Sequence, residues 1–115
     1  MDAYNANPSS MESAINSFKK RDGKKTVILG DMFELGKESE LEHYKLIKKC
    51  IEEKIENIFL VGNEFFKHSN KFDSPIFFKN KKEFVLHFQN SKLKSDNILL
   101  KGSRGMKMED LIEHL

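Results

Sequence analysis

Residue types that could bind a charged small molecule are concentrated in three short segments of this sequence. They are residues 2–8 (Asp-Ala-Tyr-Asn-Ala-Asn-Pro), 30–36 (Gly-Asp-Met-Phe-Glu-Leu-Gly) and 101–106 (Lys-Gly-Ser-Arg-Gly-Met). A guanidinium such as that of Arg104 can pair with both oxygens of a carboxylate or phosphate, and flanking glycines let an anion approach backbone amides. The third segment therefore predicts an anion site, with Lys101 and Ser103 beside Arg104.

Each segment also has a purely structural interpretation. Asn7 can cap a helix that starts at Pro8, and the glycines can serve turns that require a positive φ. Asp31 and Glu34 can be ordinary loop acids. The position of Arg104 argues for a site, because a cation at the start of a helix is mildly unfavourable and such exceptions often mark functional places.

Several motifs that carry chemistry are absent from the sequence. It has neither a Gly-x-x-x-x-Gly-Lys-Ser/Thr phosphate loop nor a Gly-x-Gly-x-x-Gly fingerprint, so the chain is not expected to hold ATP by itself. It also lacks a Gly-x-Ser-x-Gly nucleophile elbow. The histidines show no metal-ligand spacing, and Cys50 falls near the apolar stripe of a predicted helix. We therefore expect no metal site, no complete catalytic site and a structural cysteine.

The composition bounds the class of protein. A chain of 115 residues fits one domain, and 38% hydrophobic with 33% charged residues predicts a water-soluble globular fold. The 20 Lys and Arg against 18 Asp and Glu residues leave a charge of +2, which indicates neither a nucleic-acid nor a membrane partner. One cysteine cannot form an internal disulfide and no signal-peptide pattern is present, so a cytoplasmic location is expected.

The elements that must position these segments alternate between helices and strands. Apolar runs predict strands at residues 26–29, 57–61, 75–78 and 97–100, and helical spacing predicts helices over 8–18, 39–55, 63–70, 81–89 and 108–115. The alternation predicts an α/β fold, a Rossmann-like, mostly parallel sheet with helices on both faces. Ligands of such sheets bind beyond the carboxyl ends of the strands, where the second and third segments lie.

Two of the predicted helices carry detailed expectations. Ser39-Glu40-Leu41-Glu42 matches a capping box, which predicts a helix start. The buried stripe of that helix is expected to be Leu41, Tyr44, Ile47, Ile51 and Ile55. The buried stripe of the last helix is expected to be Met108, Leu111, Ile112 and Leu115.

Taken together, the three segments resemble one protein family. Residues 2–11, residues 27–36 with His43 after them, and residues 100–106 are similar, in this order, to the C-terminal domain of the Mur ligases. The resemblance covers nearly the whole chain, although residues 63–95 carry little of it. It implies that residues 1–115 are a single, third domain of a larger ligase, without its N-terminal and central ATP-binding domains.

Within the family, the chain is most similar to the members that add D-alanyl-D-alanine to the UDP-MurNAc-tripeptide, an ATP-dependent, ADP-forming step of peptidoglycan precursor synthesis. The resemblance implies that ATP and Mg²⁺ serve the full-length enzyme and are held by its central domain. ATP would phosphorylate the stem-peptide carboxylate, and the dipeptide amine would attack the acyl phosphate. This domain would close as a lid that excludes water, and the isolated chain is expected to be inactive.

The resemblance also implies roles for individual residues. A hinge that faces the nucleotide would contain Tyr4, Asn5 and Asn7. The dipeptide would be bound by Arg104, Ser103, Lys101, Asp31 and Glu34. Within this set, Arg104 would grip the dipeptide carboxylate. Asp31 and Glu34 would either orient the dipeptide amine or contact the central domain across the closed cleft. His43 also matches the family pattern, and a histidine in the second turn of a helix can equally serve to fix the preceding loop.

Two other functions remain open from the residues alone. Asp31 and Lys101 both follow predicted parallel strands, as in a receiver-like signalling domain. That interpretation lacks the acidic pair that would hold Mg²⁺, because the strand at 57–61 is followed by Gly62 and Asn63. The remaining alternative is a small-ligand-binding α/β module without chemistry.

Overall fold

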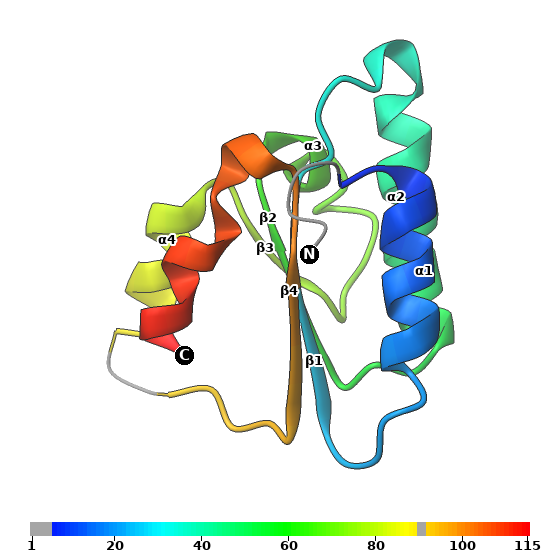
Figure 1. Ribbon diagram of the computed structural model, residues 1–115. Helices are drawn as coiled ribbons and strands as arrows, with labels where there is room; N and C mark the ends of the chain where they lie inside the picture. The colour runs from blue at the N-terminus through cyan, green and yellow to red at the C-terminus, as the bar shows by residue number, and fades with distance from the viewer. Residues whose placement is uncertain (1–5, 90–91) are drawn as a thin grey trace.

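The computed structural model describes residues 6–89 and 92–115, which form one parallel sheet with helices on both faces (Figure 1). The strands lie in the order β3-β2-β1-β4, and every neighbouring pair is parallel. In chain order the elements are α1 (Pro8–Phe18), β1 (Lys25–Gly30), the 3-10 turn η1 (Gly36–Glu38), α2 (Ser39–Glu52), β2 (Asn57–Val61), α3 (Asn63–Phe66), β3 (Ile76–Phe78), α4 (Lys81–His87), β4 (Asn97–Lys101), η2 (Arg104–Met106) and η3 (Met108–His114). The predicted α/β fold is confirmed.

Strand β1 occupies the inside of the sheet because its apolar run can be buried on both faces. Val27 pairs in register with Ile58 of β2 on one side and Leu99 of β4 on the other. The run Val27–Leu29 is fully buried. Strand β3 follows Pro75 and lies at the sheet edge. An edge position is expected there, because proline has no amide hydrogen to donate to a neighbouring strand.

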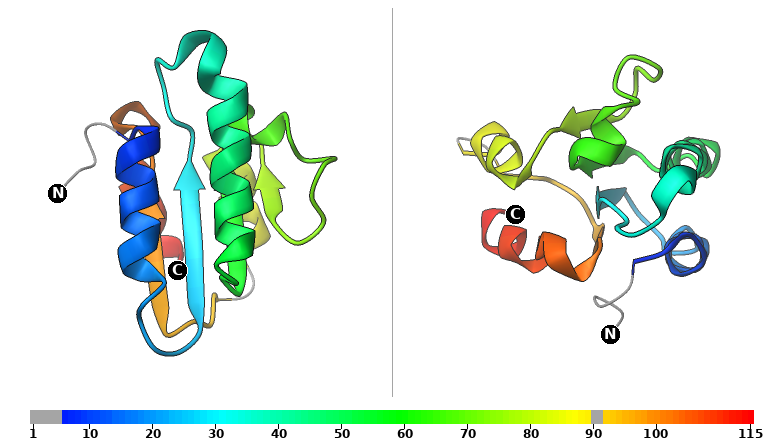
Figure 2. Two further views of the ribbon diagram at one scale, coloured as in Figure 1. Left: turned by 90° about the vertical axis from the view of Figure 1, so that its right-hand side faces the viewer. Right: turned by 90° about the horizontal axis from the view of Figure 1, so that it is seen from above.

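Two apolar layers sandwich the sheet (Figure 2). Helices α1 and α2 cover one face, where Met11, Ile15 and Ile47 join the side chains of one strand face in a common core. On the opposite face, α4 and η3 contribute Phe84 and Leu111 to a second core. Alternate strand residues point to opposite faces, so each strand serves both layers.

Helix α1 begins as the sequence predicts. Asn7 Oδ1 accepts a hydrogen bond from the backbone amide of Ser10 at 2.8 Å, and Ser10 Oγ accepts one from the Asn7 amide at 3.1 Å. This reciprocal cap satisfies two amides that have no helical partner.

Helix α2 begins at Ser39, as predicted, but without the predicted capping box, and its buried face agrees with the prediction only in part: Ile47 is buried, Leu41 is not. Turn η1 leads directly into α2, so Glu38 already has helical backbone angles and makes no side-chain cap, and Ser39 is not an N-cap. Leu41 is 58% exposed, whereas His43 and Cys50 are fully buried. The buried face differs from the predicted one because His43 and Cys50 point to the core. Neither residue was among the apolar positions from which the stripe was predicted. Helix α2 also ends before Ile55.

The C-terminal segment is a 3-10 helix instead of the predicted α-helix. Met108 and Leu111 are buried, while Ile112 is 61% exposed. In a 3-10 helix, side chains three residues apart lie on the same face. Met108 and Leu111 therefore both face the sheet, and Ile112 points away from it. Helix α3 is likewise shorter than the predicted 63–70. No helix in the described ranges is long and apolar enough to cross a bilayer.

Candidate functional site

An open cleft of about 410 Å³ lies at the carboxyl ends of β1 and β4. One wall is the loop after β1 and the other is the loop after β4, and the start of α1 closes one end. Its lining residues are Ala6, Asn7, Phe33, Glu34, Leu35, Ser103, Arg104 and Gly105. The segments 30–36 and 101–106, which the sequence singled out, thus meet at one site. Ala6 and Asn7, from the described part of segment 2–8, lie there too.

The cleft brings together part of the predicted set of binding residues. Arg104 and Glu34 are exposed residues on the two walls, and Ser103, which also lines the cleft, is buried. Lys101 instead lines a neighbouring hollow along the serine-rich face of α1. Tyr4 and Asn5 lie outside the described residues. An exposed guanidinium and an exposed carboxylate in one cleft suit a ligand that carries both an anionic and a cationic end.

Ser103 joins the two walls. Its amide donates to the carbonyl oxygen of Asp31 at 3.0 Å, and its hydroxyl oxygen accepts from the amide of Phe33 at 2.7 Å. The hydroxyl hydrogen remains available as a donor on the same oxygen. A residue predicted only as a ligand contact therefore also holds the β1 loop against the β4 loop.

Asp31 lines a neighbouring hollow, which shares Phe33 and Glu34 with the cleft, and 4% of its surface is exposed. Its carboxylate accepts hydrogen bonds from the amides of Glu64 at 3.0 Å and Phe65 at 3.1 Å, at the start of α3. Burial raises the pKa of the Asp31 carboxyl, and these two amide bonds oppose that rise. Each oxygen thus accepts a hydrogen bond from the chain itself, and a direct ligand contact of Asp31 stays a prediction.

Two glycines permit these close approaches. Gly62, at φ 127°, lies against Asp31 so closely that a Cβ would overlap the carboxyl group. At Gly102 a Cβ would come within 2.9 Å of the Cα of Gly30, so the ends of β4 and β1 can touch only without side chains there. The glycine that follows each strand is therefore part of the construction of the site.

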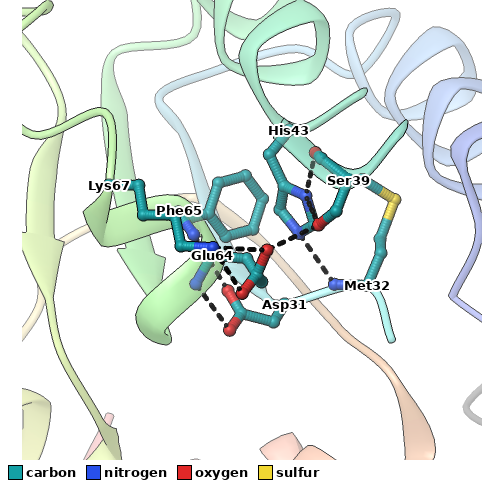
Figure 3. Close-up of polar contacts among 7 residues, drawn as sticks. All are labelled: Asp31, Met32, Ser39, His43, Glu64, Phe65 and Lys67. Carbon is teal, nitrogen blue, oxygen red and sulfur yellow. Dashed lines mark hydrogen bonds and ion pairs between the residues drawn. The ribbon is translucent and has the colours of Figure 1, made fainter. Parts of the chain in front are cut away.

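A buried histidine holds the other side of the β1 loop (Figure 3). His43 is fully buried in α2, and its Nε2 accepts a hydrogen bond from the amide of Met32 at 3.0 Å. Its Nδ1 lies 2.7 Å from the carbonyl oxygen of Ser39. The ring also packs edge-on against Phe65, with centroids 4.6 Å apart.

Ser39 and Glu64 extend this network to α3. The Ser39 hydroxyl donates to Glu64 Oε1 at 2.6 Å, and Lys67 Nζ lies 3.1 Å from Glu64 Oε2. The hydrogen bond from Ser39, followed by that from Lys67, lowers the pKa of Glu64. Sequence reasoning missed Glu64, and the one available signal was its place directly after a buried strand and a glycine.

Two predictions about other chemistry can be compared with the described residues. Cys50 is fully buried, and burial raises the pKa of its thiol to about 12, so the thiol is a core group, not a nucleophile. Within residues 6–89 and 92–115 no three His, Cys, Asp or Glu side chains are grouped to ligate a metal ion. The side-chain oxygen of Asn7, a predicted nucleotide contact, accepts the cap bond of α1.

Comparison with known proteins relates this geometry to one family. A family model described as "Mur ligase, glutamate ligase domain" matches residues 1–104. UDP-N-acetylmuramoyl-tripeptide–D-alanyl-D-alanine ligase of Buchnera aphidicola is 37% identical over 99% of this chain and 26% of its own length. The enzyme of the same name from Bacillus subtilis is 36% identical over 99% of this chain and 27% of its length.

The structural comparison agrees with the sequence comparison. A crystal structure of MurF from Acinetobacter baumannii matches 97% of this chain and 26% of that chain, with a TM-score of 0.82 and 30% sequence identity. The chain therefore spans about a quarter of the length of the relatives it matches.

Proposed function

The chain belongs to the Mur ligase family, whose glutamate ligase domain it matches, and from this premise we propose that it is the C-terminal, dipeptide-binding domain of a ligase. The reaction proposed for the whole enzyme is the ATP-dependent, ADP-forming addition of D-alanyl-D-alanine to the UDP-MurNAc-tripeptide, in the peptidoglycan precursor pathway of the cytoplasm. The isolated chain is expected to be inactive, because it spans about a quarter of its relatives.

One observation carries this proposal. Relatives at 30–37% identity over nearly the whole chain bear a single name, that of the D-alanyl-D-alanine ligase. A receiver-like signalling domain is not favoured, since Asp31, which would accept the phosphoryl group, is buried and bound to two amides. No described contact favours a binding module without chemistry over a ligase domain.

The cleft supports specific roles in binding a zwitterionic dipeptide. We propose that the Arg104 guanidinium pairs with the dipeptide carboxylate and that the Ser103 hydroxyl donates to it. Glu34, on the opposite wall, would orient the amine. Lys101 would add positive charge from the neighbouring hollow, and Asp31 would act indirectly by holding the loop that carries Glu34.

The family also implies ATP and Mg²⁺ for the full-length enzyme. The chain shows no grouping of metal ligands in the described ranges, and Asn7 uses its side-chain oxygen as a helix cap. We propose that the nucleotide, the metal and the UDP-sugar bind to the N-terminal and central parts of the ligase, with Tyr4, Asn5 and Asn7 near the junction. This domain would then position the amine and exclude water on closure.

The test is the substitution Arg104→Ala in the full-length ligase. Loss of a charge-assisted contact to the dipeptide should raise its KM about tenfold, with little change in the KM for ATP. Arg21→Ala is the matched control, because Arg21 is the chain's other arginine and lies in the exposed turn between α1 and β1, at the opposite end of the sheet.

Binding to the chain itself provides a second test. Amide chemical shifts around residues 101–106 should respond to D-alanyl-D-alanine more than to L-alanyl-L-alanine. An unchanged dipeptide KM in Arg104→Ala would contradict the assignment of Arg104. Ligation that does not depend on the dipeptide in the wild type would contradict the proposed function as a whole.

A further inference from the structure

The loop after β1 is held at three consecutive residues from two different elements. The carbonyl oxygen of Asp31 and the amide of Phe33 are bound by Ser103, from the β4 side. Between them, the amide of Met32 is bound by His43, from α2. The Asp31 carbonyl and the Met32 amide belong to one peptide group, which is thus held from both sides, and the next peptide group is held through the amide of Phe33. Neither peptide group can rotate without breaking a hydrogen bond.

The hydrogen-bond partners of His43 indicate which ring nitrogen carries its proton. Nε2 accepts from the amide of Met32, so in this arrangement Nε2 carries no proton. The ring proton must then be on Nδ1, which donates to the carbonyl oxygen of Ser39 at 2.7 Å and lies 3.2 Å from Ser39 Oγ. Since Ser39 Oγ gives its own proton to Glu64, its lone pairs face Nδ1. Ser39 and Glu64 thus favour the neutral tautomer with the proton on Nδ1.

We propose that His43 is a positioning residue for the substrate cleft, and that the Ser39–Glu64 pair holds it in the tautomer that can accept from Met32. The inference rests on the proposed function, because it assigns His43 to the dipeptide cleft of that ligase. His43 does not line the cleft. It acts through Met32 on the wall that contains Phe33 and Glu34.

Close packing makes the position of this wall matter for Arg104. A Cβ on Gly105 would lie 2.9 Å from Cε2 of Phe33, so the Phe33 ring already rests on the backbone next to Arg104. Glu34, directly after Phe33, has a φ of 64°, a conformation that a non-glycine residue adopts only when its surroundings hold it. Release of the Met32 amide would therefore shift both the ring against Gly105 and the Glu34 carboxylate across the cleft.

Two substitutions separate the acceptor role of His43 from its packing. In His43→Gln the amide oxygen can reach the place of Nε2 and accept from Met32. In His43→Asn the shorter side chain can reach Ser39 but not Met32. Both replacements are neutral and remove the ring, so both lose the contact with Phe65. A control, His68→Asn, removes a second buried histidine that packs beside Tyr44 and makes no described contact with the β1 loop.

The first measurements use the chain itself. Two-dimensional ¹⁵N NMR of the histidine side chains should show His43 with its proton on Nδ1. Amide hydrogen exchange of Met32 should be about tenfold faster in His43→Asn than in His43→Gln, the effect of one buried hydrogen bond. A proton on Nε2, or equal exchange in the two variants, would overturn the proposal.

The second measurement uses the full-length ligase. The dipeptide KM should rise about tenfold in His43→Asn and stay within about threefold of wild type in His43→Gln and His68→Asn. Equal dipeptide KM values in all three variants, with Met32 exchange accelerated in His43→Asn, would refute a role in the cleft. If the wild-type ligase does not use the dipeptide, the proposed function fails. The His43 tautomer and the exchange rate of the Met32 amide still decide, in that case, whether His43 holds the loop.

Discussion

Replacing Gly62 by alanine should destabilise the chain far more than an ordinary glycine substitution. Gly62 has φ 127° and ψ 162°, a backbone conformation that is nearly restricted to glycine and costs other residues about 1–3 kcal/mol. The new Cβ would also overlap the carboxyl group of Asp31. That carboxylate cannot move without leaving the amides of Glu64 and Phe65.

The expected loss follows from these two contributions. Each hydrogen bond to the charged carboxylate stabilises the fold by about 1.5–3 kcal/mol, so losing both would cost about 3–6 kcal/mol. With the backbone strain, the free energy of unfolding should fall by at least about 4 kcal/mol, against about 5–15 kcal/mol for a whole domain. For a chain of this size the melting temperature should fall by about 15 °C or more.

Thermal unfolding followed by circular dichroism, with urea titration for the free energy, measures this effect. Gly36→Ala is the matched control, because Gly36 also has a positive φ, 59°, but a Cβ there would meet nothing within 4 Å. It should cost about 1 kcal/mol. If Gly62→Ala costs no more than this control, the packing argument is wrong.

A double substitution separates overlap from backbone strain. In an Asp31→Ala background the overlap disappears, so Gly62→Ala should then cost only the strain, about 1–3 kcal/mol. An unchanged cost in that background would refute the contact with Asp31 as the cause.

Two further predictions concern ionisable groups. Cys50 should resist alkylation at pH 8 in the folded chain and react only after denaturant is added. The side chain is fully buried, and a thiol pKa of about 12 leaves about one thiol in 10,000 as thiolate at this pH. Rapid modification of the folded chain would contradict this prediction. The pKa of Glu64 is lowered below its usual 4.5, so the folded state favours the carboxylate, and the resulting stability is present above about pH 4.5 and lost as the pH falls through the folded-state pKa. Glu64→Gln should flatten this acid limb of the stability curve, measured by urea unfolding between pH 3 and pH 7. An unchanged limb would show that the Glu64 carboxylate is not its source.

Local patterns in the sequence were sufficient for most of the fold. Strands buried on both faces are recognisable from continuous apolar runs such as Val27–Leu29, and the cap at Asn7 depends only on residues three positions apart. The predictions failed where a local pattern competed with packing. Ser39 matches a capping box, but its hydroxyl binds Glu64, and Ile112 is turned outward by the 3-10 geometry of η3.

The sequence by itself determined the alternation of strands and helices, the family resemblance and the segments that form the cleft. Only the tertiary structure decided which of those residues line the cleft and which hold the loops. The contacts that decide this join residues far apart in the chain, such as Asp31 with Phe65 and Phe33 with Ser103. Periodicity reports on neighbours within a few residues, whereas these hydrogen bonds form only when parallel strands bring their carboxyl ends to the same edge of the sheet.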